Sequence, residues 1–475
     1  MELNINLNNL KYRYDVYQIF NLFYPYRDIK FVEEQEDFIV EIEENYIYIK
    51  NDHCYSKEEF HEAINKEHIK REVFKFLSKI TDKTLPWGTL VGIRPSKIAL
   101  EMINKGYSNE DIVRHFRESY MTREEKAKLC IDVAKREETF VNRQKDTISV
   151  YIGMAFCPTR CIYCSFSSNP IGGNKKLIDS YVKSLKEEII ALSKYIKDKN
   201  LRVQCVYFGG GTPTAISNDE FHDLMKLIYE NLIDPMKVEE FTVECGRPDS
   251  ITKEKLMTMK EFKVHRISIN PQTMNDNTLK FIGRNHSSKD VVEKFKLARD
   301  LGFHNINMDI IVGLPGEGIN EINHTLHRIK ALNPDSLTVH GMSIKRASKL
   351  HEELVLKNSF SIADQEELNS MYKAADALAH DLHMEPYYMY RQKNMVGNME
   401  NIGYSKRGKE GIYNIQIIEE KQTIIALGAD GSTKVVFLED NRIERFANVK
   451  DVREYIKRLP EMIEKKIELL NTLYS

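Results

Sequence analysis

From residue 147 onward, short apolar runs rich in β-branched and aromatic residues alternate with longer amphipathic stretches. The short runs predict strands at 148–155, 203–208, 240–245, 264–269, 306–312 and 336–342, and the longer stretches predict helices at 176–197, 219–232, 253–262, 289–301 and 321–332. This alternation favours right-handed βαβ units and a parallel sheet. Six units are too few for a closed eight-fold barrel, so the expected fold is α/β with a partial (β/α)6 TIM-like barrel.

The regions on either side of this pattern suggest three domains, at 1–140, 147–350 and 351–475. Residues 1–140 predict an α+β domain of unknown role, with a hairpin at 29–50 and helices near 61–80 and 107–141. Between those helices, LPWGTLVGIRPSK (85–97) is interpreted as a structural loop, with a substrate-contacting loop as the alternative. Residues 351–475 predict a smaller α+β extension, expected to cover the substrate, with a helix at 363–382, a hairpin near 412–437 and a final charged helix.

Composition excludes several classes of protein. The 69 basic and 71 acidic residues give a net charge of −2, so no overall field favours nucleic acid or an anionic membrane. No apolar run is long enough for a membrane span, and the first residues lack the features of a secretory signal. Seven cysteines, an odd number, do not suggest a disulfide framework, and the four outside the motif below are interpreted as buried small hydrophobes. We therefore expect a reduced, cytoplasmic protein.

Three cysteines form a C-x3-C-x2-C triplet directly after the first predicted strand: Cys157, Cys161 and Cys164. Three thiolates can ligate three irons of a [4Fe-4S] cluster and leave the fourth iron open to a small molecule, whereas clusters that only transfer electrons normally have four cysteines. A zinc site would usually add a second cysteine pair or histidines, and none is nearby. The triplet therefore favours a cluster, with zinc or unrelated buried thiols as alternatives.

A glycine run, GGGTPT (209–214), directly follows the second predicted strand. Three glycines allow the backbone to approach a ligand closely, and the run lacks the lysine and serine of a phosphate-binding loop. A plain tight turn is the alternative. Because both motifs follow parallel strands, they are expected on the same carboxyl-terminal rim of the barrel, where such folds carry out chemistry.

At this point the chain resembles the radical S-adenosylmethionine (SAM) superfamily. It is similar in particular to the oxygen-independent coproporphyrinogen III oxidase family (HemN/HemW-like), and most similar to its HemZ coproporphyrinogen dehydrogenase subgroup. The resemblance covers roughly 147–440 and rests on CPTRCIYC, GGGTPT, Glu244, RISINPQT (266–273), Arg284 and DIIVGLPGE (309–317). It implies a [4Fe-4S] cluster with three cysteine ligands, and SAM bound at the open iron and cleaved by one electron.

The resemblance also implies roles for particular residues. The metal ligands would be Cys157, Cys161 and Cys164, and SAM would be contacted by Tyr151, Tyr163, Gly210, Glu244 and Asp309. It allows a second SAM, at Gly211, Thr212, Gln272 and Arg284. No protein side chain is assigned as catalytic, because the radical comes from SAM. Structural alternatives stay open: Glu244 could pair with an arginine, Asp309 could be satisfied inside the barrel, Gln272 and Arg284 could brace loops, and the tyrosines could be core residues.

The implied activity is oxidative decarboxylation of coproporphyrinogen III to protoporphyrinogen IX in oxygen-independent heme (porphyrin) biosynthesis. Its partners would be the porphyrinogen and a low-potential electron donor such as flavodoxin or ferredoxin. Cations in 340–346 and 390–394 would suit substrate propionates, with a solvated basic patch as the alternative. The turn within 426–434 resembles the family's late glycine turn that closes over the SAM site, with a plain hairpin turn as the alternative. The alternatives are a heme-binding chaperone of the HemW type and a radical SAM methyltransferase acting on a tetrapyrrole. Phe166 stands where the oxidase has a fourth cysteine, as in the chaperone branch, but the chaperone's H-N-x-x-Y-W run is absent.

Overall fold

A computed structural model describes residues 2–25, 27–164, 168–344, 350, 352, 361–393 and 395–474. Its main sheet has eleven strands in the order β14-β15-β13-β12-β11-β10-β9-β6-β16-β17-β18. The six central strands are parallel and confirm the predicted run: β6 (Thr147–Met154), β9 (Arg202–Gly210), β10 (Glu240–Glu244), β11 (Arg266–Ser268), β12 (Ile306–Val312) and β13 (Ser336–Gly341). The predicted partial barrel is therefore correct.

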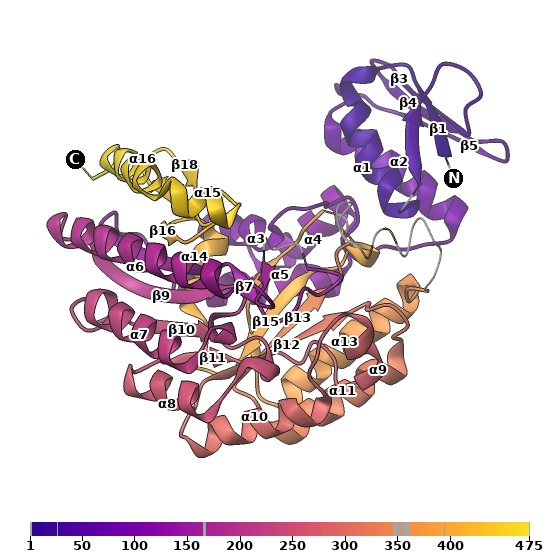
Figure 1. Ribbon diagram of the computed structural model, residues 1–475. Coiled ribbons are helices and arrows are strands. Elements are labelled where there is room, and N and C mark those ends of the chain that lie inside the picture. The colour runs from indigo at the N-terminus through magenta and orange to yellow at the C-terminus, as the bar shows by residue number, and fades with distance from the viewer. Residues whose placement is uncertain are drawn as a thin grey trace.

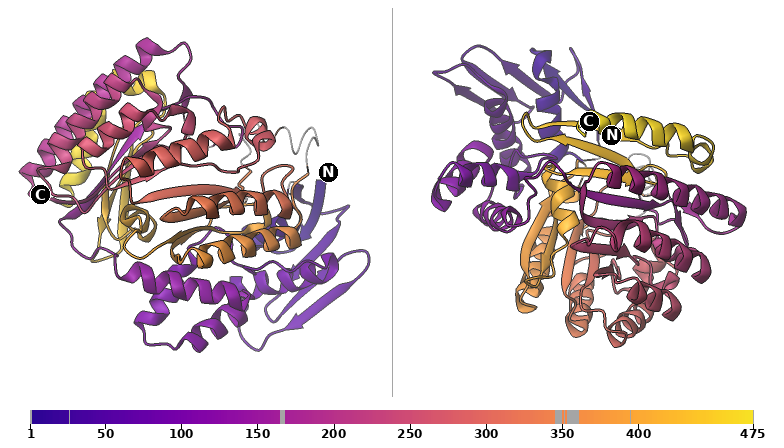
Figure 2. Two further views of the ribbon diagram at one scale, coloured as in Figure 1. Left: turned by 90° about the horizontal axis from the view of Figure 1, so that it is seen from below. Right: turned by 90° about the vertical axis from the view of Figure 1, so that its left-hand side faces the viewer.

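Helices cover the outer face of this sheet (Figures 1 and 2). The predicted ones are α6 (Lys175–Asp198), α7 (Asn218–Ile228), α8 (Lys253–Glu261), α10 (Ser288–Asp300) and α11 (Ile319–Leu332), with a short α9 (Asp276–Phe281) before α10. Several begin at capping boxes, such as Ser217 with Glu220 and Ser287 with Asp290, which satisfy the free N–H groups of the first turn. α7 continues as a π-helical turn, Tyr229–Ile233, which completes the segment expected at 219–232.

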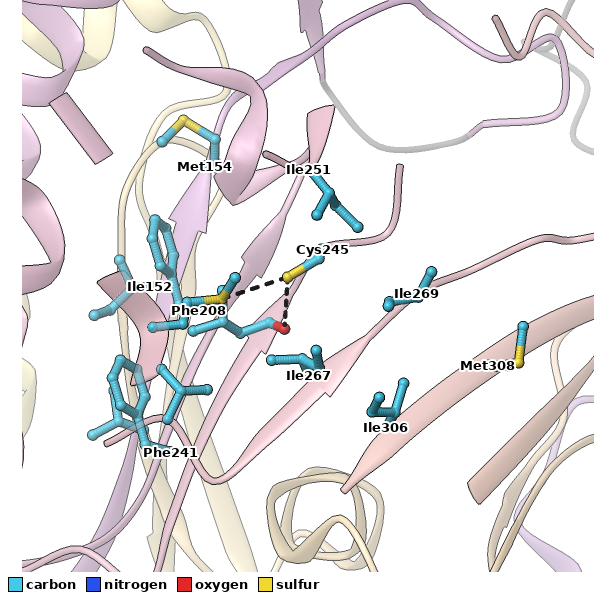
Figure 3. Packing of buried hydrophobic residues seen from close by; sticks show 14 of the residues in the cluster. Ile152, Met154, Phe208, Phe241, Cys245, Ile251, Ile267, Ile269, Ile306 and Met308 are labelled. Atoms are coloured by element: carbon cyan, nitrogen blue, oxygen red, sulfur yellow. Dashed lines mark hydrogen bonds between the residues drawn. The ribbon is translucent and has the colours of Figure 1, made fainter. Parts of the chain in front are cut away.

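The two faces of the parallel strands carry different side chains because residues alternate between faces along a strand. Figure 3 shows one set packed in an apolar layer, including Ile152 and Met154 of β6, Phe208 of β9 and Met308 of β12. The alternate residues are mainly polar or aromatic and line a cavity on the inner face; they are Tyr151, Tyr207, Thr242, Glu244, Arg266, Ser268, Asn307, Asp309, Thr338 and His340. The same strands thus build the core and the site.

The N-terminal residues form a separate five-stranded sheet in the order β2-β1-β3-β4-β5, which lies beside the main sheet (Figures 1 and 2). Its elements are β1 (Glu2–Leu7), α1 (Arg13–Phe23), β2 (Asp28–Phe31), β3 (Phe38–Ile42), β4 (Tyr46–Lys50), β5 (Tyr55–Glu59) and α2 (Lys66–Thr81). The hairpin predicted at 29–50 is wrong in its first part. β2 pairs in parallel with β1, and only β3 and β4 form the hairpin, because the acidic turn at 33–37 separates β2 from it.

Helices α3 (Pro95–Asn104), α4 (Asn109–Tyr120) and α5 (Glu124–Glu138) follow and pack around Trp87, which is fully buried. Residues 85–94 form the predicted loop, but Pro95 begins a helix, since proline suits the first helical position. Trp87 Nε1 donates to Glu400 at 2.7 Å, and Met389 belongs to the same apolar cluster. The loop therefore packs on the C-terminal extension.

The C-terminal extension contributes strands to both edges of the main sheet. α13 (Gln365–Asp381) precedes the antiparallel pair β14 (Glu385–Tyr390) and β15 (Asn401–Ser405). The hairpin predicted near 412–437 is wrong in its first half, which is α14 (Ile412–Glu419). The hairpin is β16 (Thr423–Leu427) with β17 (Ser432–Phe437), followed by β18 (Arg442–Ala447). β16 pairs in parallel with β6, which the sequence pattern did not predict.

The chain ends in α15 (Val452–Lys457) and α16 (Leu459–Asn471), and α16 lies along α6 (Figure 1). A small parallel pair, β7 (Phe156–Cys157) with β8 (Asn169–Pro170), brackets the cysteine triplet. Among the described residues, no helix is both long and apolar enough to cross a membrane. Cys130, Cys205 and Cys245 are buried as expected, whereas Cys54 is half-exposed.

Candidate active site

A cavity of about 540 Å³ opens at the carboxyl ends of the parallel strands. Every residue to which the sequence assigned a role in binding SAM or the cluster lines it: Tyr151, Cys157, Cys161, Tyr163, Cys164, Gly210, Gly211, Thr212, Glu244, Gln272, Arg284 and Asp309. They come from five strands and four loops, so the fold brings together positions as far apart as Tyr151 and Asp309. The shared location supports one site, while the role of each residue stays a prediction.

The cysteine triplet lies at the cavity's edge with hydrogen-bond donors around it. The Thr212 hydroxyl donates to Cys157 Sγ at 3.4 Å, and Arg247 Nη1 donates to Cys161 Sγ at 3.6 Å. In the free protein, burial raises the pKa of Cys157. Such donors stabilise thiolates, so the donor set fits an iron–sulfur cluster. Phe166 lies outside the described residues.

No group of three His, Cys, Asp or Glu side chains in the described parts of the chain converges closely enough to hold a single metal ion. A mononuclear zinc site requires such convergence of its ligands on one point. A cubane distributes its three thiolates over three different irons, so its ligands need not converge. The absence of such a group among the described residues therefore does not argue against a cluster at the triplet.

The glycine run passes very close to the strand that precedes the triplet. An added Cβ on Gly211 would lie 2.5 Å from the Phe156 carbonyl oxygen, and one on Gly210, whose φ is +94°, would lie 2.8 Å from that of Met154. The backbone N–H groups of Gly211 and Thr212 donate to the same two carbonyls, at 2.6 and 2.8 Å. The run therefore needs glycine to fit against β6 and β7, and its role in binding a ligand stays a prediction.

Glu244 ends β10 with its carboxyl group facing the cavity and accepts a hydrogen bond from the Tyr207 hydroxyl. It does not pair with the arginines considered from the sequence. Arg247 pairs with Asp249, and Arg266 donates to Ser336 Oγ. Burial raises the pKa of Glu244 to about 7, which is what a carboxyl lacking a cation in a desolvated site should show.

Asp309 lies in the middle of β12 and lines the same cavity as Glu244, but it has protein partners. Asn307 Nδ2 donates to its Oδ1 at 2.6 Å, and His340 Nε2 lies 3.6 Å from its Oδ2. Burial acts to raise the pKa of Asp309, but hydrogen bonds and charge from His340 outweigh it and the net shift is downward. Asp309 thus has partners at both carboxylate oxygens, as the alternative of a residue satisfied inside the barrel expects, although it also lines the cavity.

Arg284 and Gln272 partly match their loop-bracing interpretation. Arg284 Nη1 donates to the carbonyls of Gly246 and Asn270 at 3.2 and 2.7 Å, and its Nε donates to the Tyr163 hydroxyl at 3.3 Å. Gln272 has a φ of +66°, and its buried side-chain oxygen has no hydrogen-bond partner within the described residues. An unpaired polar atom in a cavity wall fits a ligand that donates to it.

Three aromatic rings stack along one wall of the cavity. The Tyr151, Tyr207 and Tyr413 rings are nearly parallel, with Tyr207 and Tyr413 at a centroid separation of 4.5 Å. Tyr207 and Tyr413 were missed from sequence. Tyr207 shares the inward register of β9 with the glycine run and could have been found from strand alternation, whereas Tyr413 comes from α14, where a strand was expected.

The proposed substrate cations divide into two groups. Lys345 and Arg346 lie outside the described residues. Arg391 is buried and donates to the carbonyls of Leu90 and Asn398 at 2.9 and 2.7 Å, and Lys393 donates to the Tyr14 hydroxyl at 2.6 Å. Neither lines the main cavity, but Tyr388, Tyr390 and Gln392 of the same segment do.

The turn within 426–434, interpreted as closing over the SAM site, does not line the cavity. It is the β16–β17 hairpin turn, and Gly428, with a φ of +89°, packs against the Gly153 carbonyl of β6. Its N–H donates to the buried carboxylate of Glu188 at 2.7 Å. The hairpin-turn alternative is therefore the correct one.

Comparisons with known proteins define the class. Residues 151–329 match the Radical SAM superfamily. The fold resembles that of coproporphyrinogen III oxidase HemN from Escherichia coli, a radical SAM enzyme, with a TM-score of 0.52 and 19% identity over 70% of this chain and 73% of that one. Members of this superfamily use a [4Fe-4S] cluster and SAM, and the thiols, their donors and the ligand-facing polar groups described above fit both.

The relatives narrow the class further. The chain is 40% identical to the oxygen-independent coproporphyrinogen-III oxidase-like protein HemZ of Bacillus subtilis, over 83% of this chain and 79% of HemZ. It is 30% identical to the heme chaperone HemW of the same organism, over 66% of this chain and 76% of HemW. The chain therefore belongs to the radical SAM family of oxygen-independent coproporphyrinogen III oxidase-like proteins that contains HemZ and HemW.

Proposed function

We propose that this protein oxidatively decarboxylates two propionates of coproporphyrinogen III to vinyl groups, giving protoporphyrinogen IX without oxygen. Each propionate loses a β-hydrogen atom and CO2, and one electron passes to an acceptor. A low-potential donor such as flavodoxin or ferredoxin would supply the electron that cleaves SAM. When bound, the cluster and SAM supply the hydrogen-abstracting chemistry.

The observation that carries the proposal is the carboxyl of Glu244, which lacks a cationic partner within the described residues and faces the cavity that the three cysteines line. A desolvated carboxylate with no cation suits an ammonium group, and SAM has one. A Cβ built on Gly209 would lie 2.8 Å from Glu244 Oε2, so the first glycine of the run leaves the room that this carboxyl occupies.

The chain's own residues would bind and orient the cluster, SAM and the tetrapyrrole. Cys157, Cys161 and Cys164 would hold the cluster, and Glu244 with the backbone of Gly210 would hold the amino group of SAM. Asp309 would accept from ribose hydroxyls with the lone pairs that Asn307 leaves free. The stacked tyrosines would present a flat apolar wall to a macrocycle and exclude water. Room for a second SAM beside Gln272 and Arg284 is part of the same proposal.

A second candidate is a heme-binding chaperone, which the identity to HemW favours. It would bind heme stoichiometrically and leave the tetrapyrrole unchanged. The tyrosine wall would serve either role, so the distinction must come from the product.

The test is an anaerobic assay of reconstituted protein with SAM, a low-potential reductant and coproporphyrinogen III, analysed by mass spectrometry. The proposal predicts loss of two CO2 and formation of protoporphyrinogen IX. An unchanged porphyrinogen, together with tight stoichiometric binding of heme, would reject the decarboxylase and support the chaperone.

The pH dependence of SAM binding tests the role of Glu244. Burial raises its pKa to about 7, Asp309 adds to the rise, and Tyr207, His340 and Arg266 oppose it. Only the ionised carboxylate pairs with an ammonium, so SAM affinity should fall by up to about tenfold per unit as the pH drops from about 7 towards 5.5. Calorimetric titration should show this slope in the wild type and its loss in Glu244→Gln. An unchanged slope in that variant would contradict the contact.

A further inference from the structure

A second cleft opens beside the main cavity and shares one wall with it. It is lined by Ile93, Arg94, Lys97, Glu101, Tyr390 and Arg391, and is called the basic cleft below. Tyr390, the last residue of β14, lines both spaces, while the following Arg391 lines the basic cleft and Gln392 lines the main cavity. A ligand in the main cavity is therefore one side chain away from the basic cleft.

Three cations line the basic cleft, and among the described residues only one of them, Arg94, forms an ion pair with a carboxylate. Arg94 Nη2 donates to Glu420 at 2.6 Å, but Glu420 also accepts from Lys434 and Arg445, both at 2.9 Å. One carboxylate thus forms ion pairs with three cations. The Lys97 side chain makes no hydrogen bond or ion pair within the described residues, although its charge is near enough to Glu419 to oppose the rise that burial causes in the pKa of that carboxyl.

Arg391 adds a buried cation that no carboxylate pairs with in the described chain. It is 5% exposed, and two of its nitrogens donate to backbone carbonyls. Its third nitrogen, Nε, is buried without a partner. The guanidinium lies 4.6 Å from the centre of the Trp87 ring, which fixes its position. A buried guanidinium with an unused donor is an unfavourable structural element, and its charge adds positive potential to the cleft that Arg391 lines.

The local backbone favours the same kind of ligand. Arg94 immediately precedes α3 and Lys97 lies in its first turn, where the helix dipole adds positive potential. Gly92, with a φ of +57°, brings the loop so close to Lys393 that a Cβ there would lie 2.9 Å from the lysine Cγ. Glu101 is the one carboxylate in the lining, and it is exposed at the outer end.

We propose that the basic cleft binds a carboxylate arm of the tetrapyrrole substrate while the macrocycle occupies the main cavity. This rests on the proposed function and extends it, because it assigns substrate recognition to the loop at 85–97 and the start of α3. Ile93 and Tyr390 contact the methylene stem, and Arg94, Lys97 and Arg391 bind the carboxylate. The N-terminal region thereby contributes directly to substrate specificity.

The test compares two stable probes, coproporphyrin III and its tetramethyl ester, in fluorescence titrations of the full-length protein. Wild type should bind the free acid more tightly than the ester. Lys97→Gln should weaken binding of the acid about tenfold, the loss expected for one charge-assisted contact, and leave the ester unaffected. Lys97→Arg should restore binding of the free acid. Lys105→Gln, at the exposed far end of α3, should bind both probes as wild type does.

Two results would count against the proposal, and they differ. If wild type binds the acid and Lys97→Gln binds it equally well, the basic cleft does not hold the carboxylate, while the proposed function stands. If wild type binds neither probe, the proposed function itself fails. Arg94→Gln is a second test of whether the basic cleft holds the carboxylate. Its melting temperature must be checked, because Arg94 also pairs with Glu420.

Discussion

Replacing Cys161 by alanine should abolish the cluster and, with it, all cleavage of SAM. Cys161 is the most buried of the three cysteines, and Arg247 donates to its sulfur. Two remaining thiolates cannot hold three irons, so a cubane with an open iron cannot persist. Anaerobic reconstitution followed by iron and sulfide analysis should give about four irons per wild-type chain and almost none in Cys161→Ala. The brown absorption and the 5′-deoxyadenosine product should disappear together.

The matched control is Cys54→Ala, since Cys54 is half-exposed, lies in the N-terminal sheet region and donates only to Asn51. It should retain iron, colour and SAM cleavage. Circular dichroism should show the same secondary structure in both variants, because the triplet lies in a loop outside the apolar layer. Retained SAM cleavage in Cys161→Ala would contradict the cluster assignment.

The second large effect is expected from a buried ion pair that attaches the last helix to the barrel. Lys466 of α16 and Glu188 of α6 are both fully buried, with Nζ and Oε1 2.5 Å apart. The Tyr455 hydroxyl and Asn448 Nδ2 also donate to Glu188, at 2.7 and 2.9 Å. Lys466 donates in addition to the Ala426 carbonyl of β16. This network joins α16 and β16 of the C-terminal extension to α6.

Lys466→Ala should destabilise the protein by about 3–5 kcal/mol, because it leaves the Glu188 carboxylate buried without a cation. The neighbouring Lys465→Ala is the control. Lys465 is half-exposed and pairs with Glu461 at the surface, so its loss should cost at most about 1 kcal/mol. Denaturant unfolding measures both. A double variant, Glu188→Gln with Lys466→Met, should recover part of the loss, and equal costs for the two lysine variants would refute the account.

Strand alternation explains why much of the site could be predicted. The six parallel strands were visible as apolar runs, and a motif directly after such a strand must lie on the carboxyl-terminal rim. Cys157 and Gly210 were placed correctly by this rule alone. The same alternation places Tyr207, Thr242 and Asn307 in the cavity, so it could have predicted these three residues as well.

The sequence could not predict which strands pair when they lie far apart in the chain. β16 pairs with β6 across more than two hundred residues, and β2 leaves its neighbour β3 to pair with β1. Neither choice has a local signal, because hydrophobic periodicity shows that a strand is half-buried and not which strand it joins. The basic cleft depends on such a pairing of distant segments, since Arg94 and Arg391 lie close only in the folded chain.

The most direct test of the central claim follows hydrogen from the substrate. Coproporphyrinogen III deuterated at the β-carbons of its propionates is incubated anaerobically with reconstituted protein, SAM and reductant, and the 5′-deoxyadenosine is analysed by mass spectrometry. The account predicts 5′-deoxyadenosine carrying one deuterium, formed together with vinyl product. Unlabelled 5′-deoxyadenosine with intact porphyrinogen would show that SAM is cleaved without reaction at the propionates, and would contradict the proposed function.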